Sequence, residues 1–200
     1  MMDRKENLLN IINKLIPEQF IKSSKLIAAS CEENSREMVH EFLKAFMSAK
    51  EQAMICQDND EKGKLSYILF SNLYSSIFLK NYLIRIDMMD SSFYSDTAFS
   101  TSYWDARNIY YLFEEDIKAI SKQIEAYFPR IREYEVDYIR YAYIPYYHRI
   151  TKAFIHSMLT EAISVEGFLP CKDRLDNQVH ILFGEYMGQA DILYILGKEP

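Results

Sequence analysis

Residues that interrupt secondary structure are scarce in this chain. Only five Gly and five Pro occur among its 200 residues, so long helices or strands are expected. Hydrophobic residues make up 49% and charged residues 26% of the sequence, which is the balance of an ordinary globular protein and excludes general disorder. A chain of this length can bury most of its apolar surface in one core. We therefore expect a single domain spanning residues 1–200.

An excess of basic residues is also missing. Lys and Arg together number 23 against 29 Asp and Glu, which gives a formal net charge of −6. Broad binding to a nucleic-acid backbone requires clustered cations that displace counterions from the phosphates. Nucleic acid is therefore not the expected partner of this protein.

Signals for disulfides, export and membrane insertion are absent as well. The three cysteines, Cys31, Cys56 and Cys171, form no C-x-x-C pair, and this pattern predicts neither a disulfide framework nor a zinc site. Residues 1–6 lack the apolar stretch and cleavage site of a signal peptide. The most apolar run, residues 65–79, carries several polar residues and is shorter than the ~20 residues of a membrane span. We expect a cytoplasmic protein that does not enter a membrane.

Apolar residues at helical spacing are what the sequence offers instead. Pro17 ends the first periodic segment, and Pro145 is expected to kink a long helix near the C-terminal third of the chain. Helices are predicted over residues 8–16, 18–29, 34–57, 65–79, 102–128, 130–165 and 173–196. The period is lost in residues 82–99, where a small extended or hairpin insertion is expected. The predicted fold is an all-α bundle of about six or seven helices.

Two histidine-containing patterns bear on whether this chain could be a metal-dependent enzyme. Glu37 and His40 form an E-x-x-H step, which places a carboxylate and an imidazole on one helix face as di-iron carboxylate bundles require. The sequence contains no second E-x-x-H step. His148 and His156 would lie ~12 Å apart along a helix, so the chain departs from the three-histidine pattern of the DinB family of helical-bundle metal enzymes. Glu37 and His40 remain alternative metal ligands, and no cofactor is expected.

A loose resemblance to helical HEPN ribonucleases gives a second enzymatic alternative. That family carries an Arg and a His with four to six residues between them, and the pairs Arg149–His156 and Arg174–His180 meet this spacing. The resemblance implies that the Arg stabilises phosphate charge while the His acts as a general acid or base. An apolar residue follows each Arg here, where the family usually has a polar one.

Tyrosines and arginines interleave between residues 127 and 149. Such a stretch suits a binding surface, because tyrosine and arginine combine apolar area with hydrogen-bonding groups. An aromatic stripe at helical spacing is equally typical of a core. The candidate binding residues are Arg130, Tyr134, Tyr138, Arg140, Tyr141 and Tyr147.

Motifs of phosphate binding and nucleophilic catalysis do not occur in the sequence. It contains no Gly-rich phosphate loop, no nucleophile elbow and no H-E-x-x-H zinc motif. The interpretation that remains is a noncatalytic interaction or regulatory module that binds a protein partner or itself.

Overall fold

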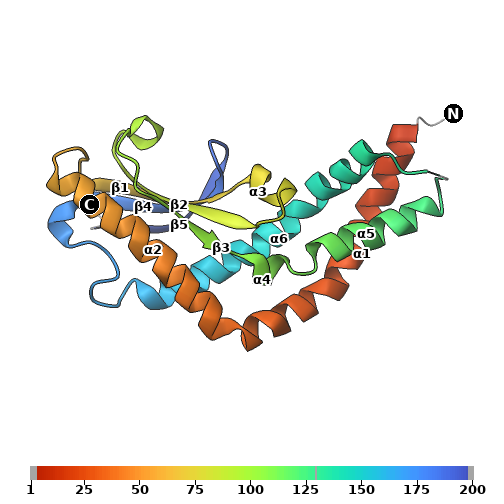
Figure 1. The fold of residues 1–200 in the computed structure, drawn as a ribbon, viewed down its shortest axis with the longest axis horizontal. Coiled ribbons are helices and arrows are strands. Elements are labelled where there is room, and N and C mark those ends of the chain that lie inside the picture. Colours follow the sequence, from red (N-terminus) through yellow and green to blue (C-terminus); the bar gives the residue numbers. More distant parts are fainter. Residues whose placement is uncertain (1–3, 129, 198–200) are drawn as a thin grey trace. The chain divides into compact units, whose positions relative to one another are not determined.

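The structure is a computed structural model that describes residues 4–128 and 130–197. Figure 1 shows the course of the chain through its helices and strands. In order they are α1 (Arg4–Glu33), α2 (Ser35–Asp58), β1 (Leu65–Asn72), α3 (Tyr74–Phe78), β2 (Leu83–Asp90), η1 (Phe93–Ser95), β3 (Thr101–Asp105), α4 (Arg107–Tyr110), α5 (Phe113–Glu125), α6 (Glu133–Ala162), η2 (Lys172–Arg174), β4 (Leu175–Glu185) and β5 (Ala190–Gly197). Within the described ranges, no helix has the length and apolar content needed to cross a bilayer.

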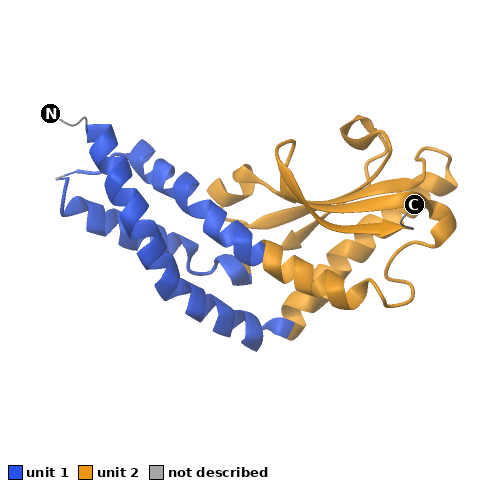
Figure 2. Cartoon of the chain, turned by 180° about the vertical axis from the view of Figure 1, so that it is seen from behind, with its two compact units in different colours: residues 1–35, 108–151 blue, residues 36–107, 152–200 orange. Residues whose placement is uncertain are grey.

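The chain divides into two compact units, coloured separately in Figure 2. Unit 1 takes residues 1–35 and 108–151, and unit 2 takes residues 36–107 and 152–200. The sheet lies in unit 2, whereas the described part of unit 1 is helical. The prediction of a single domain over residues 1–200 stays a prediction.

A five-stranded mixed sheet makes the predicted all-α bundle wrong. The strand order is β3-β2-β1-β4-β5. Strands β1, β2 and β3 form an antiparallel meander, β4 pairs with β1 in parallel, and β5 pairs antiparallel with β4. The helices between β3 and β4 provide the long connection that a parallel pair requires.

Strand β1 occupies the segment that was predicted as a central helix. Its residues are buried on both faces of the sheet, apart from the half-buried Tyr67. A strand covered on both faces shows a continuous apolar run rather than alternation, and such a run has no period that distinguishes it from a buried helix. Only Tyr74–Phe78, the short α3, is helical in this stretch.

The predicted C-terminal helix is also wrong, because residues 175–197 form the β4–β5 hairpin. Val179, Ile181 and Phe183 alternate toward one face and are buried. Their spacing of two residues is the signal of a strand, whereas leucines elsewhere in the segment happen to fall at helical intervals. The turn between the strands brings the Glu185 amide to the Gln189 carbonyl at 2.9 Å.

The remaining predictions are confirmed in part by the element boundaries. Residues 82–99, predicted as an extended insertion, contain β2 and η1, and β2 is a central member of the sheet. The predicted helix over 102–128 starts as β3 and becomes helical in α4 and α5. Pro17 lies inside the continuous helix α1, so the boundary predicted there is wrong, and Pro145 lies inside α6, within a long helix as predicted. Helix α2 closely matches the predicted span.

Aromatic packing joins α2 to one face of the sheet in unit 2. Phe42 on α2 lies 5.7 Å from the ring of Phe70 on β1 and 5.5 Å from that of Trp104 on β3. Phe154, in the part of α6 that belongs to unit 2, stacks on Trp104 at 5.1 Å. The opposite face, called the open face below because loops rather than α2 cover it, carries Tyr67, Leu69, Arg85, Asp87 and Leu182 by register. In Figure 1 the loops after β2 and after β4 rise on the side away from α2.

Helices α1, α5 and the first part of α6 form the core of unit 1. Phe113, Ile117, Ile120 and Ile124 on α5 are buried, as their spacing predicts. On α1, Ile12 and Ile16 are buried in the same unit. The ring of Phe20 lies 6.4 Å from that of Tyr143 on α6.

Candidate functional site

The start of helix α6 in unit 1 is organised by a glutamate in its first turn. Glu133 is the first helical residue, which makes Arg132 the N-cap and Glu135 the third residue of the helix. The Glu135 carboxylate accepts a hydrogen bond from the Arg132 amide at 2.8 Å. This hydrogen bond is one of the two in a capping box: the side chain of the third helical residue accepts from the backbone amide of the N-cap residue, which has no partner within the helix.

Arg4, the first described residue of α1, clamps the same carboxylate. Its Nε and Nη2 donate to the two oxygens of Glu135, each at 3.0 Å, and Nη2 also donates to the Arg130 carbonyl at 2.7 Å. The guanidinium carbon lies 4.8 Å from the ring centroid of Phe128. The hydrogen bonds from Arg4 hold the pKa of Glu135 below its usual value. Two parallel bonds to one carboxylate fix orientation as well as distance, so this clamp defines a rigid wall.

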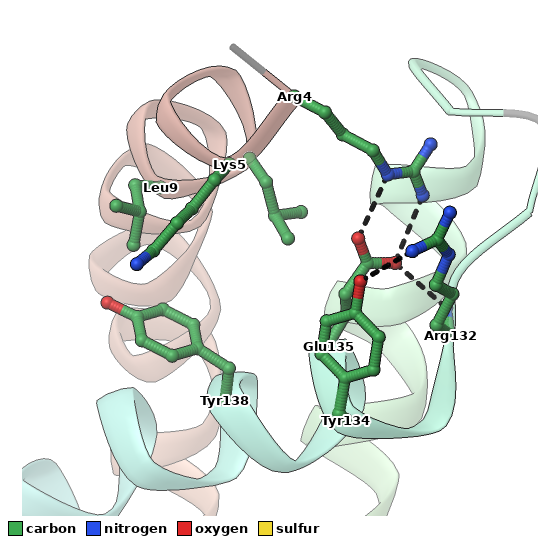
Figure 3. Close-up of a pocket in the computed structure, with 8 residues that line it drawn as sticks. Arg4, Lys5, Leu9, Arg132, Tyr134, Glu135 and Tyr138 are labelled. Carbon is green, nitrogen blue, oxygen red and sulfur yellow. Dashed lines mark hydrogen bonds and ion pairs between the residues drawn. The ribbon is translucent and has the colours of Figure 1, made fainter.

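A cavity of about 470 Å³ opens beside this clamp. It is lined by Arg4, Lys5, Leu8, Leu9, Arg132, Tyr134, Glu135 and Tyr138. Figure 3 shows Lys5, Leu9 and Tyr138 on one side of the cavity and the Arg4–Glu135 clamp with Arg132 and Tyr134 on the other. Its volume lies within the range of ~300–1,000 Å³ that is typical of ligand pockets.

The charge around the cavity is positive. Arg4, Lys5 and Arg132 supply three cations, and Glu135 is the single carboxylate among the lining residues. Glu135 is already held by Arg4, whereas Lys5 forms no ion pair with any described residue. Arg132 donates to the Tyr134 hydroxyl at 2.9 Å. In a chain whose net charge is −6, this local excess of cations favours an acidic ligand.

The candidate binding residues from the sequence are only partly brought together. Tyr134 and Tyr138 line the cavity, with exposures of 60% and 42%, and Arg130 contributes its carbonyl to the Arg4 clamp. Tyr141 is exposed at 49% but does not line the cavity. Two others turn away: Arg140 forms an ion pair with Glu114, and Tyr147 is buried. The lining residues of α1 were missed, because nothing in the sequence indicates that residues 4–9 lie beside residues 132–138.

Tyr147 instead belongs to a buried hydrogen-bond network around Asp116 on α5. One oxygen of Asp116 accepts from Ser23 at 2.6 Å and from Gln19 at 2.7 Å. The other accepts from the hydroxyls of Tyr143 at 2.6 Å and Tyr147 at 2.8 Å. Burial, followed by interactions with Asp116, raises the pKa of both tyrosines. Four donors satisfy this carboxylate fully, so the network is structural and leaves no lone pair directed at a ligand.

The residues proposed for a nuclease each contact other partners. Arg149 lies over the ring of Tyr146 with 5.3 Å between guanidinium carbon and centroid, and the His156 ring stacks on Tyr194 at 4.9 Å. In unit 2, Arg174 donates to Asp58 at 2.6 Å and to the Met54 carbonyl at 3.1 Å. His180 lies in strand β4 and stacks on Tyr67 at 5.6 Å. The helix on which the second pair was placed is therefore absent, because this segment forms η2 and β4.

Metal ligands do not converge in the part of the chain that the structure describes. Among residues 4–128 and 130–197, no group of three or more His, Cys, Asp or Glu side chains is arranged to hold a metal ion. Glu37 and His40 both lie on α2, without a third such ligand from the described residues. Comparisons with known protein families, curated proteins and solved structures give no match to this chain. The cavity beside the Arg4–Glu135 clamp is therefore the feature of the described residues that bears on function.

Proposed function

We propose that this chain is a noncatalytic interaction module whose cavity at Arg4, Lys5 and Arg132 binds an acidic segment of a protein partner. The observation that carries the proposal is the combination of three cations with an apolar wall in one cavity. Leu8 and Leu9 supply that wall. A partner segment that places an apolar side chain against the leucines and a carboxylate near Lys5 matches both properties.

The exposed tyrosines beside the cavity favour a protein over a small molecule as the occupant. Tyr134, Tyr138 and Tyr141 follow one another at spacings of four and three along α6, and all three are exposed. Residues at these spacings share one helix face. Tyrosine and arginine are enriched at protein interfaces, where a large rigid side chain buries area at low entropic cost. The cavity is then the centre of a surface that extends along α6.

The Arg4–Glu135 clamp makes the surface rigid before a partner arrives. Glu135 is 3% exposed and receives both Arg4 bonds and the Arg132 amide. Binding therefore orders few additional side chains on this wall, and a preorganised surface loses less conformational entropy on association.

Selection from a random peptide library tests the proposal directly. On the wild-type chain, we expect enrichment of peptides in which Asp or Glu flanks Leu, Phe or Tyr. The double variant Lys5→Glu/Arg132→Glu should bind the same peptides about tenfold more weakly, because each reversal replaces a modest attraction by a repulsion. The matched control Lys14→Glu/Lys118→Glu changes the net charge equally at exposed positions in unit 1 that do not line the cavity.

Three outcomes would contradict the proposal. They are enrichment without acidic residues, equal binding by the Lys5→Glu/Arg132→Glu variant, and loss of binding in the Lys14→Glu/Lys118→Glu control. Light scattering on the wild-type chain distinguishes a foreign partner from a second copy of this chain. A dimer that dissociates in the Lys5→Glu/Arg132→Glu variant would identify self-association as the function of this surface.

A further inference from the structure

A second cavity lies in unit 2, on the open face of the sheet. Its volume is about 220 Å³. Residues of β2 and β3 form its floor, and the loop of residues 91–100 and the β4–β5 turn form its walls. Figure 1 shows these two loops rising side by side from the sheet on the face away from α2. This cavity is independent of the protein-binding surface proposed for unit 1.

The floor holds a half-buried donor, Arg85, next to a buried acceptor, Asp87. Arg85 Nε donates to both oxygens of Asp87, at 2.9 and 2.7 Å, and its Nη2 donates to the Thr101 hydroxyl at 3.3 Å. The Thr101 hydroxyl donates to Asp87 at 2.6 Å. Arg85 Nη1 donates to no described residue, and one Asp87 oxygen accepts from Arg85 alone. The floor therefore offers a free guanidinium donor beside a carboxylate with unused acceptor capacity.

The charges that surround the cavity cancel. Lys62 forms an ion pair with Asp96, in which the side chains are 1% and 4% exposed, and it donates to the Met88 carbonyl at 3.1 Å. Asp96 also accepts the amide of Ala98 at 2.9 Å, which fixes the loop. Together with the Arg85–Asp87 pair, this leaves two cations and two carboxylates among the lining residues. A carboxylate that accepted a hydrogen bond from Arg85 Nη1 would be repelled by the adjacent Asp87 carboxylate, whereas an uncharged ligand can offer Asp87 a donor.

The walls are aromatic. The Arg85 guanidinium carbon lies 4.5 Å from the ring centroid of Tyr186, and the Tyr94 ring lies 6.0 Å from Tyr186 and 4.4 Å from Phe93. The Met187 amide donates to the Tyr94 hydroxyl at 3.0 Å, which joins the two loops. The Tyr94 ring stands at 85° to Tyr186 and at 59° to Phe93. Such walls suit a flat aromatic ligand, because aromatic rings attract one another edge-to-face as well as stacked.

Two wall residues hold unusual backbone conformations. Phe93 has φ of 53° and Met187 has φ of 56°, and bulky residues rarely occupy this left-handed region. Both line the cavity. Strained conformations of this kind cluster at ligand clamps, where the surrounding structure maintains them.

We propose that this cavity binds a small, flat, uncharged molecule that presents a hydrogen-bond acceptor and donor side by side, as a primary carboxamide on an aromatic ring does. The acceptor pairs with Arg85 Nη1 and the donor with the Asp87 carboxylate. The ring lies against Tyr186 and Phe93. The volume is below the range for drug-sized ligands, so the ligand is one ring with a short substituent.

Benzamide and benzoate are matched probes for this proposal, because they share a ring and differ in charge and in the amide donor. Methionine methyl groups report binding by NMR: Met89 and Met187 line the cavity, and Met38 and Met47 on α2 do not. We expect benzamide to shift the Met89 and Met187 signals with a Kd of about 1 mM, as its small size allows. Benzoate should bind at least about tenfold more weakly, and the Met38 and Met47 signals should stay in place.

Two variants localise the binding and leave all four charged lining residues in place. Tyr186→Leu removes an aromatic wall, and Ala98→Leu fills part of the cavity; each should weaken benzamide binding about tenfold or more. Tyr103→Leu is the matched control, because Tyr103 lies on the open face, is 51% exposed and does not line the cavity. The emission of the single tryptophan, Trp104, confirms that each variant folds. Absence of benzamide shifts at its solubility limit, equal binding of benzoate, or unchanged binding in Tyr186→Leu would each overturn the proposal.

Discussion

Removing one hydroxyl from the network at Asp116 gives a sharp test of how unit 1 is stabilised. Tyr147→Phe deletes the donor that lies 2.8 Å from Asp116 and changes little else, because Tyr147 is fully buried among aromatic rings. A hydrogen bond to a charged acceptor contributes about 1.5–3 kcal/mol. We therefore expect the free energy of unfolding at neutral pH to fall by about 1.5–3 kcal/mol, measured by urea denaturation with circular dichroism.

The same substitution changes how stability depends on alkaline pH. Tyr143 and Tyr147 have pKa values raised above the ordinary value of about 10 in the folded state. Above that pH the unfolded chain releases protons that the folded chain retains, so stability is full below about pH 10 and is lost as the pH rises. Each tyrosine contributes a loss of about 1.4 kcal/mol per pH unit. Tyr147→Phe should therefore reduce the alkaline slope by about that amount.

Tyr127→Phe is the control for both measurements. Tyr127 lies in the same unit and is 65% exposed, so its loss should change stability by less than about 0.5 kcal/mol at any pH tested. If Tyr147→Phe behaves like Tyr127→Phe, the network does not stabilise the fold and the reasoning is refuted. A double substitution of Tyr143 and Tyr147 should cost more than the two single costs together, because it leaves one buried oxygen of Asp116 without a donor.

Three further predictions concern other parts of the fold. Burial lowers the pKa of His148 to about 4, whereas its value in the unfolded chain is about 6.5. As the pH falls from about 6.5 to 4, the unfolded chain binds a proton that the folded chain does not, and the folded state loses roughly 3 kcal/mol of stability. In His148→Gln, the urea-denaturation midpoint should depend less on pH across this range. Phe42→Ala removes a fully buried ring that contacts β1 and β3, so urea denaturation should show the free energy of unfolding reduced by about 3–5 kcal/mol. The control Ile55→Ala, at a side chain that is 52% exposed, should reduce it by under about 1 kcal/mol. Gly184→Ala would drive its new methyl group into the Gln189 carbonyl at the β4–β5 turn, and thermal melting should show a loss of about 1–3 kcal/mol; an unchanged melting temperature would contradict the turn geometry.

Amphipathic helices were the part of the fold that the sequence could predict. On α5, Phe113, Ile117 and Ile120 face the core while Glu115 and Lys118 face solvent, and this contrast gives the helix a clear period. Strand β1 has no such contrast, because both of its faces are covered. A helix and a doubly buried strand then present the same apolar run, and only the tertiary structure decides between them.

Proline was misread at Pro17, where it was taken as a helix boundary, whereas Pro145 lies within one long helix, as predicted. Pro17 was predicted to end a helix, because it lacks an amide donor and crowds the preceding turn. Helix α1 nevertheless continues through it, with Ile12 and Ile16 buried before it and Ser23 and Ile27 buried after it. Burial of this continuous face on both sides of Pro17 outweighs the loss of one helical hydrogen bond. Whether a proline ends a helix therefore depends on how the residues before and after it pack, which the sequence alone does not show.

The candidate cavity could not be predicted for a related reason, which concerns distance along the chain. Its wall joins Arg4 to Glu135, separated by 131 positions. Helical spacing correctly placed Tyr134 and Tyr138 on one face of α6, but it contains no information about which element packs opposite that face. A basic residue at the start of one helix and an acidic residue in the first turn of another are common features with ordinary local explanations. The two residues become part of a binding surface only when α1 and α6 pack together. Arg4 then pairs with Glu135, and Lys5 and Arg132 are the cations of the cavity that remain available to a partner.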